Sequence, residues 1–149
     1  MPMYELIYCS HATKDFSEDE LVEMLTTFRA CNNVHKVSGI LVYDKMEFIQ
    51  LIEGEKKTIQ QLYNNICNDK RHSNINLFFE GPIRDRNFPD WSMGFIRNKK
   101  LGQKIIGYSD IFDQNLSAVI TDKQHSIGTH LFKVLCASLY FDRFGNMLS

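Results

Sequence analysis

Residues 48–55 read FIQLIEGE, and this stretch decides how the rest of the chain is interpreted. Its apolar and β-branched residues predict a β-strand, in which Phe48, Gln50 and Ile52 share one face. Gln50 therefore lies on an apolar face, where a primary amide without hydrogen-bond partners costs about 1–3 kcal/mol. The partners of this amide are either neighbouring backbone groups, as for an ordinary core glutamine, or groups that serve a function.

The length and composition are those of one folded domain. The chain has 149 residues, of which 44% are hydrophobic and 23% charged, and its formal net charge is -1. This size fits one hydrophobic core, and the charge gives no electrostatic reason to expect binding to nucleic acid. No apolar run is long enough to span a membrane, and the N-terminus lacks the pattern of a signal peptide. We expect a cytoplasmic protein that does not bind membranes.

The cysteines, histidines and glycines form no pattern of a known metal or nucleotide site. The four cysteines are far apart and include no C-x-x-C pair, so we expect small core residues. His125 and His130 are five residues apart and would not share a helix face. The glycines match neither G-x-G-x-x-G nor a P-loop. We therefore expect no metal site and no nucleotide bound by these motifs.

The order of the predicted elements indicates the fold. Ser17 and Glu20 form a capping box that begins an amphipathic helix, which ends at Asn32 and Asn33. A second helix has its apolar stripe in residues 59–66 and stops near residue 69. Five strands are predicted, at residues 4–10, 37–43, 46–53, 75–80 and 91–96, with Gly54 ending the third and Gly81-Pro82 the fourth. The order β-α-β-β-α-β-β predicts an α+β, ferredoxin-like mixed sheet with two helices on one face.

The C-terminal third is less regular and is expected to cover the other sheet face. Residues 101–121 fit either helix or loop, whereas the next segment carries a helical stripe, with Gly145 as its C-terminal cap. The stripe consists of Ile127, Leu131, Val134, Leu135 and Leu139. An uncovered apolar sheet face would be a large exposed patch. We therefore expect a core at residues 1–98 and a helical extension at 99–149 that packs on the sheet.

Tyr8, Asn32 and Gln50 are candidates for one site. The first and third strands are central neighbours in a ferredoxin-like sheet, so Tyr8 and Gln50 can be adjacent under the helices and hydrogen bond. A planar heteroaromatic ligand between the helices would need amide groups at its edge, which Asn32 and Gln50 offer. It would also need apolar walls, which Met24 and Ile66 offer.

Six short motifs, in order and with matching spacing, resemble the BLUF domain, a blue-light sensor that uses flavin. The resemblance covers residues 4 to about 97. The motifs are IYCS around Tyr8, Asn32 after the first helix, VSGILVY at 37–43, FIQLIEGE at 48–55, DKRH at 69–72 and FPDWSM at 88–93.

The resemblance implies a flavin held noncovalently between the two helices, usually FAD, with FMN or riboflavin as alternatives. Tyr8 matches the family's electron and proton donor, and Gln50 matches the amide that bridges it to the flavin N5/C4=O edge. Asn32 matches the amide on the pyrimidine side. The remaining matches are Met24 and Ile66 against the ring faces, Asp69, Arg71 and His72 near the ring edge and the ribityl-phosphate side, and Trp91 and Met93 as the relay on the fifth strand.

The chain departs from the family pattern at three positions. Cys31 stands where a polar residue is common, and Phe28 and Ser38 stand where serine and threonine are frequent. Phe28 is expected to alter contacts to the flavin.

The implied function is a blue-light photoreceptor that turns over no substrate and is therefore not an enzyme. Tyr8 passes an electron and a proton to the flavin, and Gln50 rotates or tautomerises. The signal then runs through the fifth strand and the C-terminal helices to a partner protein or to a rearrangement of a homo-oligomer.

Two other classes remain open. An enzyme of the acylphosphatase kind needs a phosphate-binding loop with arginine near the first strand, and residues 9–13 supply none. A light-insensitive ferredoxin-like interaction module without flavin would explain the C-terminal helix. It would not explain the set of Tyr8, Asn32 and Gln50.

Overall fold

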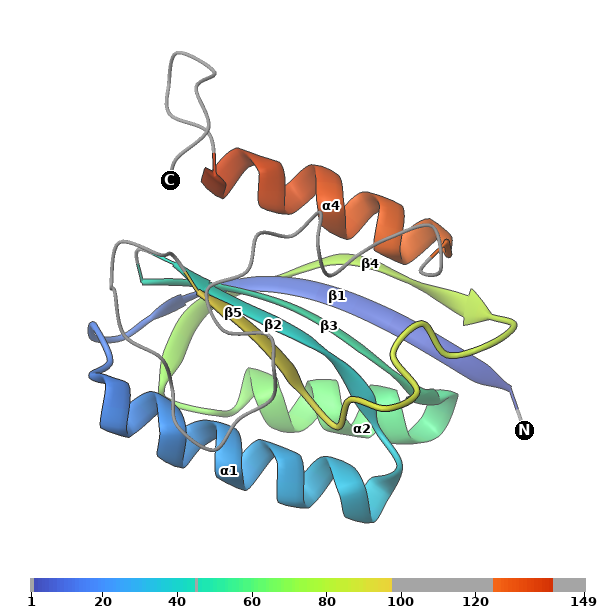
Figure 1. The fold of residues 1–149 in the computed structure, drawn as a ribbon, viewed down its shortest axis with the longest axis horizontal. Helices are drawn as coiled ribbons and strands as arrows, with labels where there is room; N and C mark the ends of the chain where they lie inside the picture. The colour runs from blue at the N-terminus through green and yellow to red at the C-terminus, as the bar shows by residue number, and fades with distance from the viewer. Residues whose placement is uncertain (1, 45, 98–124, 141–149) are drawn as a thin grey trace.

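The structure is a computed structural model that describes residues 2–44, 46–97 and 125–140 (Figure 1). The elements in these ranges are β1 (Met3–Ala12), α1 (Glu18–His35), β2 (Ser38–Asp44), β3 (Glu47–Glu55), α2 (Lys56–Cys67), β4 (His72–Ile83), β5 (Gly94–Arg97) and α4 (Ile127–Tyr140). This order confirms the predicted β-α-β-β-α-β-β pattern. The segment at 101–121 and Gly145, for which predictions were made, lie outside the described residues.

The sheet has the strand order β4-β1-β3-β2-β5. The β4–β1, β1–β3 and β3–β2 pairings are antiparallel, and β5 runs parallel to β2. Figure 1 shows α1 and α2 on one face of this sheet and α4 on the other. The α+β class and the two-sided covering of the sheet are therefore as predicted, and β1 and β3 are the central neighbours that the site requires.

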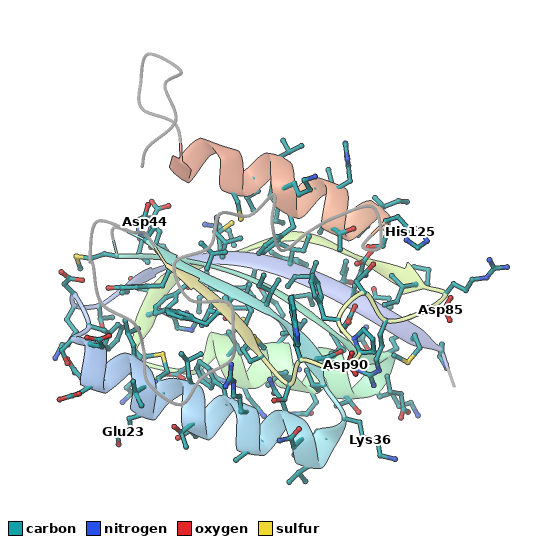
Figure 2. The ribbon with its side chains drawn as sticks, viewed as in Figure 1. Glu23, Lys36, Asp44, Asp85, Asp90 and His125 are labelled. Atoms are coloured by element: carbon teal, nitrogen blue, oxygen red, sulfur yellow. The ribbon has the colours of Figure 1, made fainter. Side chains whose placement is uncertain are left out.

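Each face of the sheet carries its own hydrophobic cluster, and Figure 2 shows side chains filling the space on both sides of the sheet. The cluster under α1 and α2 includes Tyr8, Met24 and Phe48, and the cluster under α4 includes Ile7 and Phe132. Alternation along the strands assigns each side chain to one of these faces. None of the described helices is both long and apolar enough to cross a membrane.

The ends of α1 follow from local chemistry. The Ser17 side chain accepts a bond from Glu20 N, and the Glu20 side chain accepts one from Ser17 N, as predicted for the capping box. The helix extends beyond the predicted end at Asn32 and Asn33, and Lys36 closes it in the left-handed conformation with φ of 57°.

The predicted strand ends at glycine were wrong for β3 and β4. Gly54 does not end β3, because it pairs with Tyr4 of β1 and the strand continues to Glu55. Gly81 and Pro82 lie inside β4, which pairs only with β1 in the sheet order. A proline is tolerated there because an edge strand does not need every N–H for pairing.

The predicted position of β5 was also wrong at its start. The strand begins at Gly94, so Trp91 and Met93 precede it. The carbonyl of Trp91 accepts a bond from Gly39 N, and the carbonyl of Ser92 accepts one from the Asn32 side chain. These bonds hold the segment at the end of the sheet before regular pairing with β2 begins.

The predicted apolar stripe of α4 was partly wrong. Ile127 and Val134 are 69% and 58% exposed, whereas Phe132 and Cys136 are fully buried. Leu131 and Leu135 are half-buried, and the side chain of Leu139 lies outside the described residues. The helix is apolar on more than one side, so its sequence alone does not determine which side faces the sheet.

The cysteines were expected in the core, and only part of that prediction holds. Cys136 is buried and Cys9 half-buried, but Cys31 and Cys67 are exposed on α1 and at the end of α2. All four thiols are free.

Candidate functional site

Tyr8 and Gln50 form the centre of the site. They are direct partners in the β1–β3 pairing, and Tyr8 Oη donates a hydrogen bond to Gln50 Oε1. Both side chains are buried. Burial raises the pKa of the Tyr8 phenol above its ordinary value of 10.0, so the hydroxyl keeps its proton and acts as the donor.

The other end of the Gln50 amide contacts Met93. Its Nε2 donates to Met93 Sδ at 3.3 Å. The amide on the apolar face is therefore satisfied by a phenol and a thioether, not by backbone groups. Because a thioether only accepts hydrogen bonds, this contact favours the amide orientation in which Oε1 faces Tyr8.

An open pocket lies between α1, α2 and the sheet. The space between its walls, the open mouth included, amounts to about 520 Å³. All eight predicted cofactor-binding residues line it: Tyr8, Met24, Asn32, Gln50, Ile66, Asp69, Arg71 and His72. Apolar walls with a few convergent polar groups suit a planar heteroaromatic ligand such as a flavin ring.

Asn32 connects the pocket with the segment before β5. It is buried on α1, and its Nδ2 donates to Ser92 O at 2.6 Å. A primary amide has a second N–H and a carbonyl oxygen besides this bond. Asn32 can therefore hold the backbone of this segment and offer polar groups to a ligand at once.

Asp69 and Arg71 supply the charged wall of the pocket. Arg71 Nε donates to Asp69 Oδ1 at 2.9 Å, and this pairing lowers the pKa of Asp69 below its usual range. The guanidinium carbon of Arg71 lies 5.2 Å from the centre of the Phe28 ring. Phe28, one of the departures from the family pattern, thus lines the pocket beneath a cation.

His72 is fixed by two hydrogen bonds. Its Nε2 lies 2.7 Å from Ile66 O, and its Nδ1 lies 2.7 Å from Ser10 Oγ. Because a backbone carbonyl only accepts, Nε2 must carry a proton. The ring joins β1 to the end of α2 and lies edge-on to Tyr8, with 6.1 Å between the ring centres.

Trp91 and Met93 lie on opposite faces of the sheet. Met93 is buried beside Gln50, whereas Trp91 stacks on Phe88 with ring centres 5.3 Å apart and packs against the cluster under α4. The structure therefore places Met93 against Gln50, on the face of the sheet that carries the pocket, and Trp91 on the side that α4 covers.

Some residues of the site were not predicted. Ser10 follows Tyr8 on the same strand face, and this alternation could have identified it. Leu62 belongs to the predicted apolar stripe of α2 and now lines the pocket. Arg29 Nε donates to Met93 O at 3.0 Å, across 64 residues, and no local pattern indicates that contact.

The comparisons with known proteins agree with this geometry. The family model described as "Sensors of blue-light using FAD", BLUF, matches residues 3–94. The chain is 37% identical over 70 residues to a blue light- and temperature-regulated antirepressor of Escherichia coli, covering 47% of this chain and 17% of that protein. It is 29% identical over 89 residues to a photoactivated adenylate cyclase subunit beta of Euglena gracilis, covering 59% of this chain and 10% of that protein. The chain thus spans less than a fifth of the length of these curated relatives.

Solved structures show the same fold. The dark-state structure of BlrB, a BLUF protein, superimposes with a TM-score of 0.63 at 33% identity, covering 67% of this chain and 76% of that one. A bacterial light-regulated adenylyl cyclase superimposes with a TM-score of 0.63 at 26% identity, covering 91% of this chain and 34% of that one. The motifs, the pocket and the family match lead to one conclusion: the chain belongs to the BLUF family of blue-light sensors that use FAD.

Proposed function

We propose that this protein is a blue-light photoreceptor that holds a flavin between α1 and α2 and signals through Gln50, Met93 and α4. The observation that carries the proposal is the buried Tyr8–Gln50 hydrogen bond at the wall of the pocket. A phenol and an amide in contact can exchange protons and reverse their hydrogen bonding without other reactants.

Different pocket residues would contact different parts of the flavin. Met24 and Ile66 would lie against the ring faces, and Asn32 and Gln50 would bond its polar edge. Asp69, Arg71 and His72 would hold the ring edge and the ribityl-phosphate side. FAD is the cofactor in the family description, whereas BlrP1 of Klebsiella pneumoniae, which shares the fold, has been solved with FMN, so FMN and riboflavin remain alternatives.

The light reaction starts at Tyr8. When bound, the flavin supplies blue-light absorption and, once excited, an acceptor for one electron. Tyr8 would pass one electron and then its hydroxyl proton to the bound flavin, and both would return to Tyr8 at the end of the cycle. Until the proton returns, Gln50 Oε1 lacks its donor, so the amide can rotate or tautomerise. When Tyr8 regains its electron and proton, Gln50 presents a changed hydrogen-bonding edge to the pocket and to Met93.

This local change must be amplified. One rearranged hydrogen bond is worth about 1 kcal/mol net, whereas changing a two-state output from mostly off to mostly on requires about 5.5 kcal/mol. A bistable element must therefore be biased by the change at Gln50. The segment that carries Trp91 and Met93 fits this role because it contacts both the pocket and the cluster under α4.

The proposed route of signalling depends on how the chain is divided into a core and an extension. We infer that residues 1–98 are the flavin-binding core and that 99–149 form the output extension. The protein acts in the cytoplasm and catalyses no reaction of its own. It signals by binding another protein, as the antirepressor name of one relative suggests, or by rearranging a homo-oligomer.

The test is the visible absorption spectrum of the purified chain before and after blue light. A flavin spectrum that shifts slightly to the red and recovers in the dark supports the proposal. Gln50→Leu should bind flavin without shifting, whereas the exposed control Gln60→Leu should shift normally. A chain that stays colourless after flavin is added would instead support the light-insensitive interaction module.

A further inference from the structure

Two buried carboxylates lie on the sheet face opposite the pocket. Glu5 of β1 and Glu53 of β3 are direct partners in the strand pairing, and they are 1% and 0% exposed. Buried charges are destabilising unless they are hydrogen bonded, so their partners show what these residues hold in place.

Glu53 holds the start of the segment that leads to Trp91. Its Oε2 accepts from Asn87 N at 2.9 Å and its Oε1 from Phe88 N at 2.7 Å. The Asn87 side chain also donates to Oε2 at 3.2 Å. Phe88 stacks on Trp91, and Trp91 N donates to Phe88 O, so Glu53 fixes the base of a tight turn.

Glu5 holds the first turn of α4. Its Oε1 accepts from Ser126 Oγ at 2.8 Å and its Oε2 from Gly128 N at 2.9 Å. A Cβ at Gly128 would lie 2.3 Å from the Glu5 carboxyl carbon, so only glycine allows this approach. The positive end of the helix dipole favours a carboxylate at this place.

Ser126 joins the two groups. Its hydroxyl donates to Glu5, and it accepts from the Asn87 side chain at 3.1 Å. The same oxygen accepts from Thr129 N at 3.1 Å, which caps α4. Gln50 contacts Met93, the chain before Met93 forms the turn at residues 88–91, and Asn87 at the start of this turn contacts the N-terminus of α4 through Ser126.

We infer that the Asn87–Ser126 hydrogen bond couples the turn at residues 88–91, on the sheet face opposite the pocket, to the docking of α4. Asn87, Ser126 and Glu5 are positioning residues: they are not among the residues that line the pocket, and they decide how a movement of this turn reaches the helix. The light-dependent part of this inference rests on the proposed function. The coupling in the dark depends only on the contacts above.

The experiment is a double-mutant cycle on the full flavin-loaded chain with Asn87→Ala, Ser126→Ala and the double variant. Hydrogen exchange of Gly128 N–H and His130 N–H reports the first turn of α4, because their acceptors, Glu5 and Ser126 O, remain in all variants. In the dark, each single variant should lower the protection factors of these two amides roughly two- to tenfold. The reduction in the double variant should be smaller than the product of the two single-variant reductions. Strictly multiplicative losses would overturn the coupling.

In the light, the same amides should change protection in the unmodified chain, and that response should disappear in both single variants while the red shift persists. Ser126→Thr keeps the hydroxyl and should restore the response, and the exposed control Lys133→Ala should behave like the unmodified chain. An intact red shift with an unchanged α4 response in both variants would overturn the inference alone. The absence of flavin or of any red shift would overturn the proposed function. The double-mutant cycle measured in the dark would then still test the coupling between Asn87 and Ser126.

Discussion

The Tyr8 hydroxyl donates to Oε1 of Gln50, its direct partner across the antiparallel β1–β3 pair. Both side chains are buried, at 4% and 5% exposure, where they line the pocket. Gln50 Nε2 donates to Met93 Sδ. A change at Tyr8 therefore alters both contacts of a single amide, one toward the pocket and one toward the segment before β5.

Removing the Tyr8 hydroxyl should abolish the light response and leave flavin binding largely intact. In Tyr8→Phe the Gln50 Oε1 atom loses its donor, so the free energy of unfolding should fall by about 1 kcal/mol. The red shift should be absent because neither the proton nor the buried bond is available. Absorption difference spectra and urea unfolding of the same preparations measure the two effects.

Tyr63 provides the matched control for that variant. Its ring centre lies 6.0 Å from that of Tyr8, and its side chain is half-buried. Tyr63→Phe should keep the red shift. A shift of normal size in Tyr8→Phe would contradict the role given to the Tyr8–Gln50 bond.

The fold could be predicted because alternation and helical periodicity are local and strong. They placed Gln50 on one strand face with Phe48 and Ile52, and they gave the element order. Strand ends were less predictable because they depend on the partner strand. Gly54 resembles a strand end, yet β1 pairs with it, and Pro82 is tolerated only because β4 is an edge strand.

The pocket was largely predictable, and the opposite face was not. Tyr8, Asn32 and Gln50 could be brought together because a ferredoxin-like order places their elements side by side. The Ser126–Glu5 contact joins residues 121 positions apart through a helix with several apolar sides. No local pattern indicates which side packs, so neither the buried Phe132 nor this contact could be predicted.

Gly39 should tolerate no side chain. A Cβ there would lie 2.0 Å from the backbone carbonyl oxygen of Leu51 on the neighbouring strand. Because the clash is between a fixed Cβ and backbone, no change of rotamer relieves it. Gly39→Ala should lower the free energy of unfolding by about 3 kcal/mol, measured by urea denaturation.

Gly81→Ala is the control for the Gly39 variant. At Gly81 the nearest atom to a Cβ is the end of the Phe79 side chain, at 3.3 Å, and a side chain can move. The expected loss is below about 1 kcal/mol. Similar losses at the two positions would show that the backbone contact at Gly39 does not limit β2–β3 packing.

Glu5 should make stability fall as the pH rises. Burial raises its pKa above the ordinary value of 4.5, although the bonds from Ser126 and Gly128 oppose this shift. The folded protein then binds the proton more tightly than the unfolded chain. The free energy of unfolding therefore decreases as the pH rises from about 4.5 through the folded-state pKa. Glu5→Gln should remove this slope, which urea unfolding at several pH values measures as the difference between the two proteins.

Glu20 gives the contrasting case on the surface. Its hydrogen bond to Lys14 lowers the pKa of Glu20 to about 2. A lowered pKa stabilises the folded state above the unfolded value, and this stabilisation is lost as the pH falls toward 2. The difference in the free energy of unfolding between the unmodified protein and Glu20→Gln should therefore change below about pH 4.5. Its sign should be opposite to that of the change expected for Glu5→Gln. If the free energy of unfolding of Glu5→Gln differed from that of the unmodified protein in the pH range and with the sign expected for Glu20, burial would not raise the pKa of Glu5.

Met93 should control whether the light signal crosses the sheet. Trp91 is the only tryptophan of the chain, so its fluorescence reports the far side of the segment, where its ring stacks on Phe88. Met93→Leu keeps the volume and removes the acceptor of Gln50 Nε2, so the red shift should remain while the light-dependent change in Trp91 fluorescence becomes smaller. Met24→Leu makes the same exchange at a pocket residue and should leave the Trp91 response unchanged. Equal responses in the two variants would mean that the signal leaves Gln50 without passing through the Met93 sulfur. The bond from Asn32, a pocket residue, to Ser92 O would then be an alternative route to this segment.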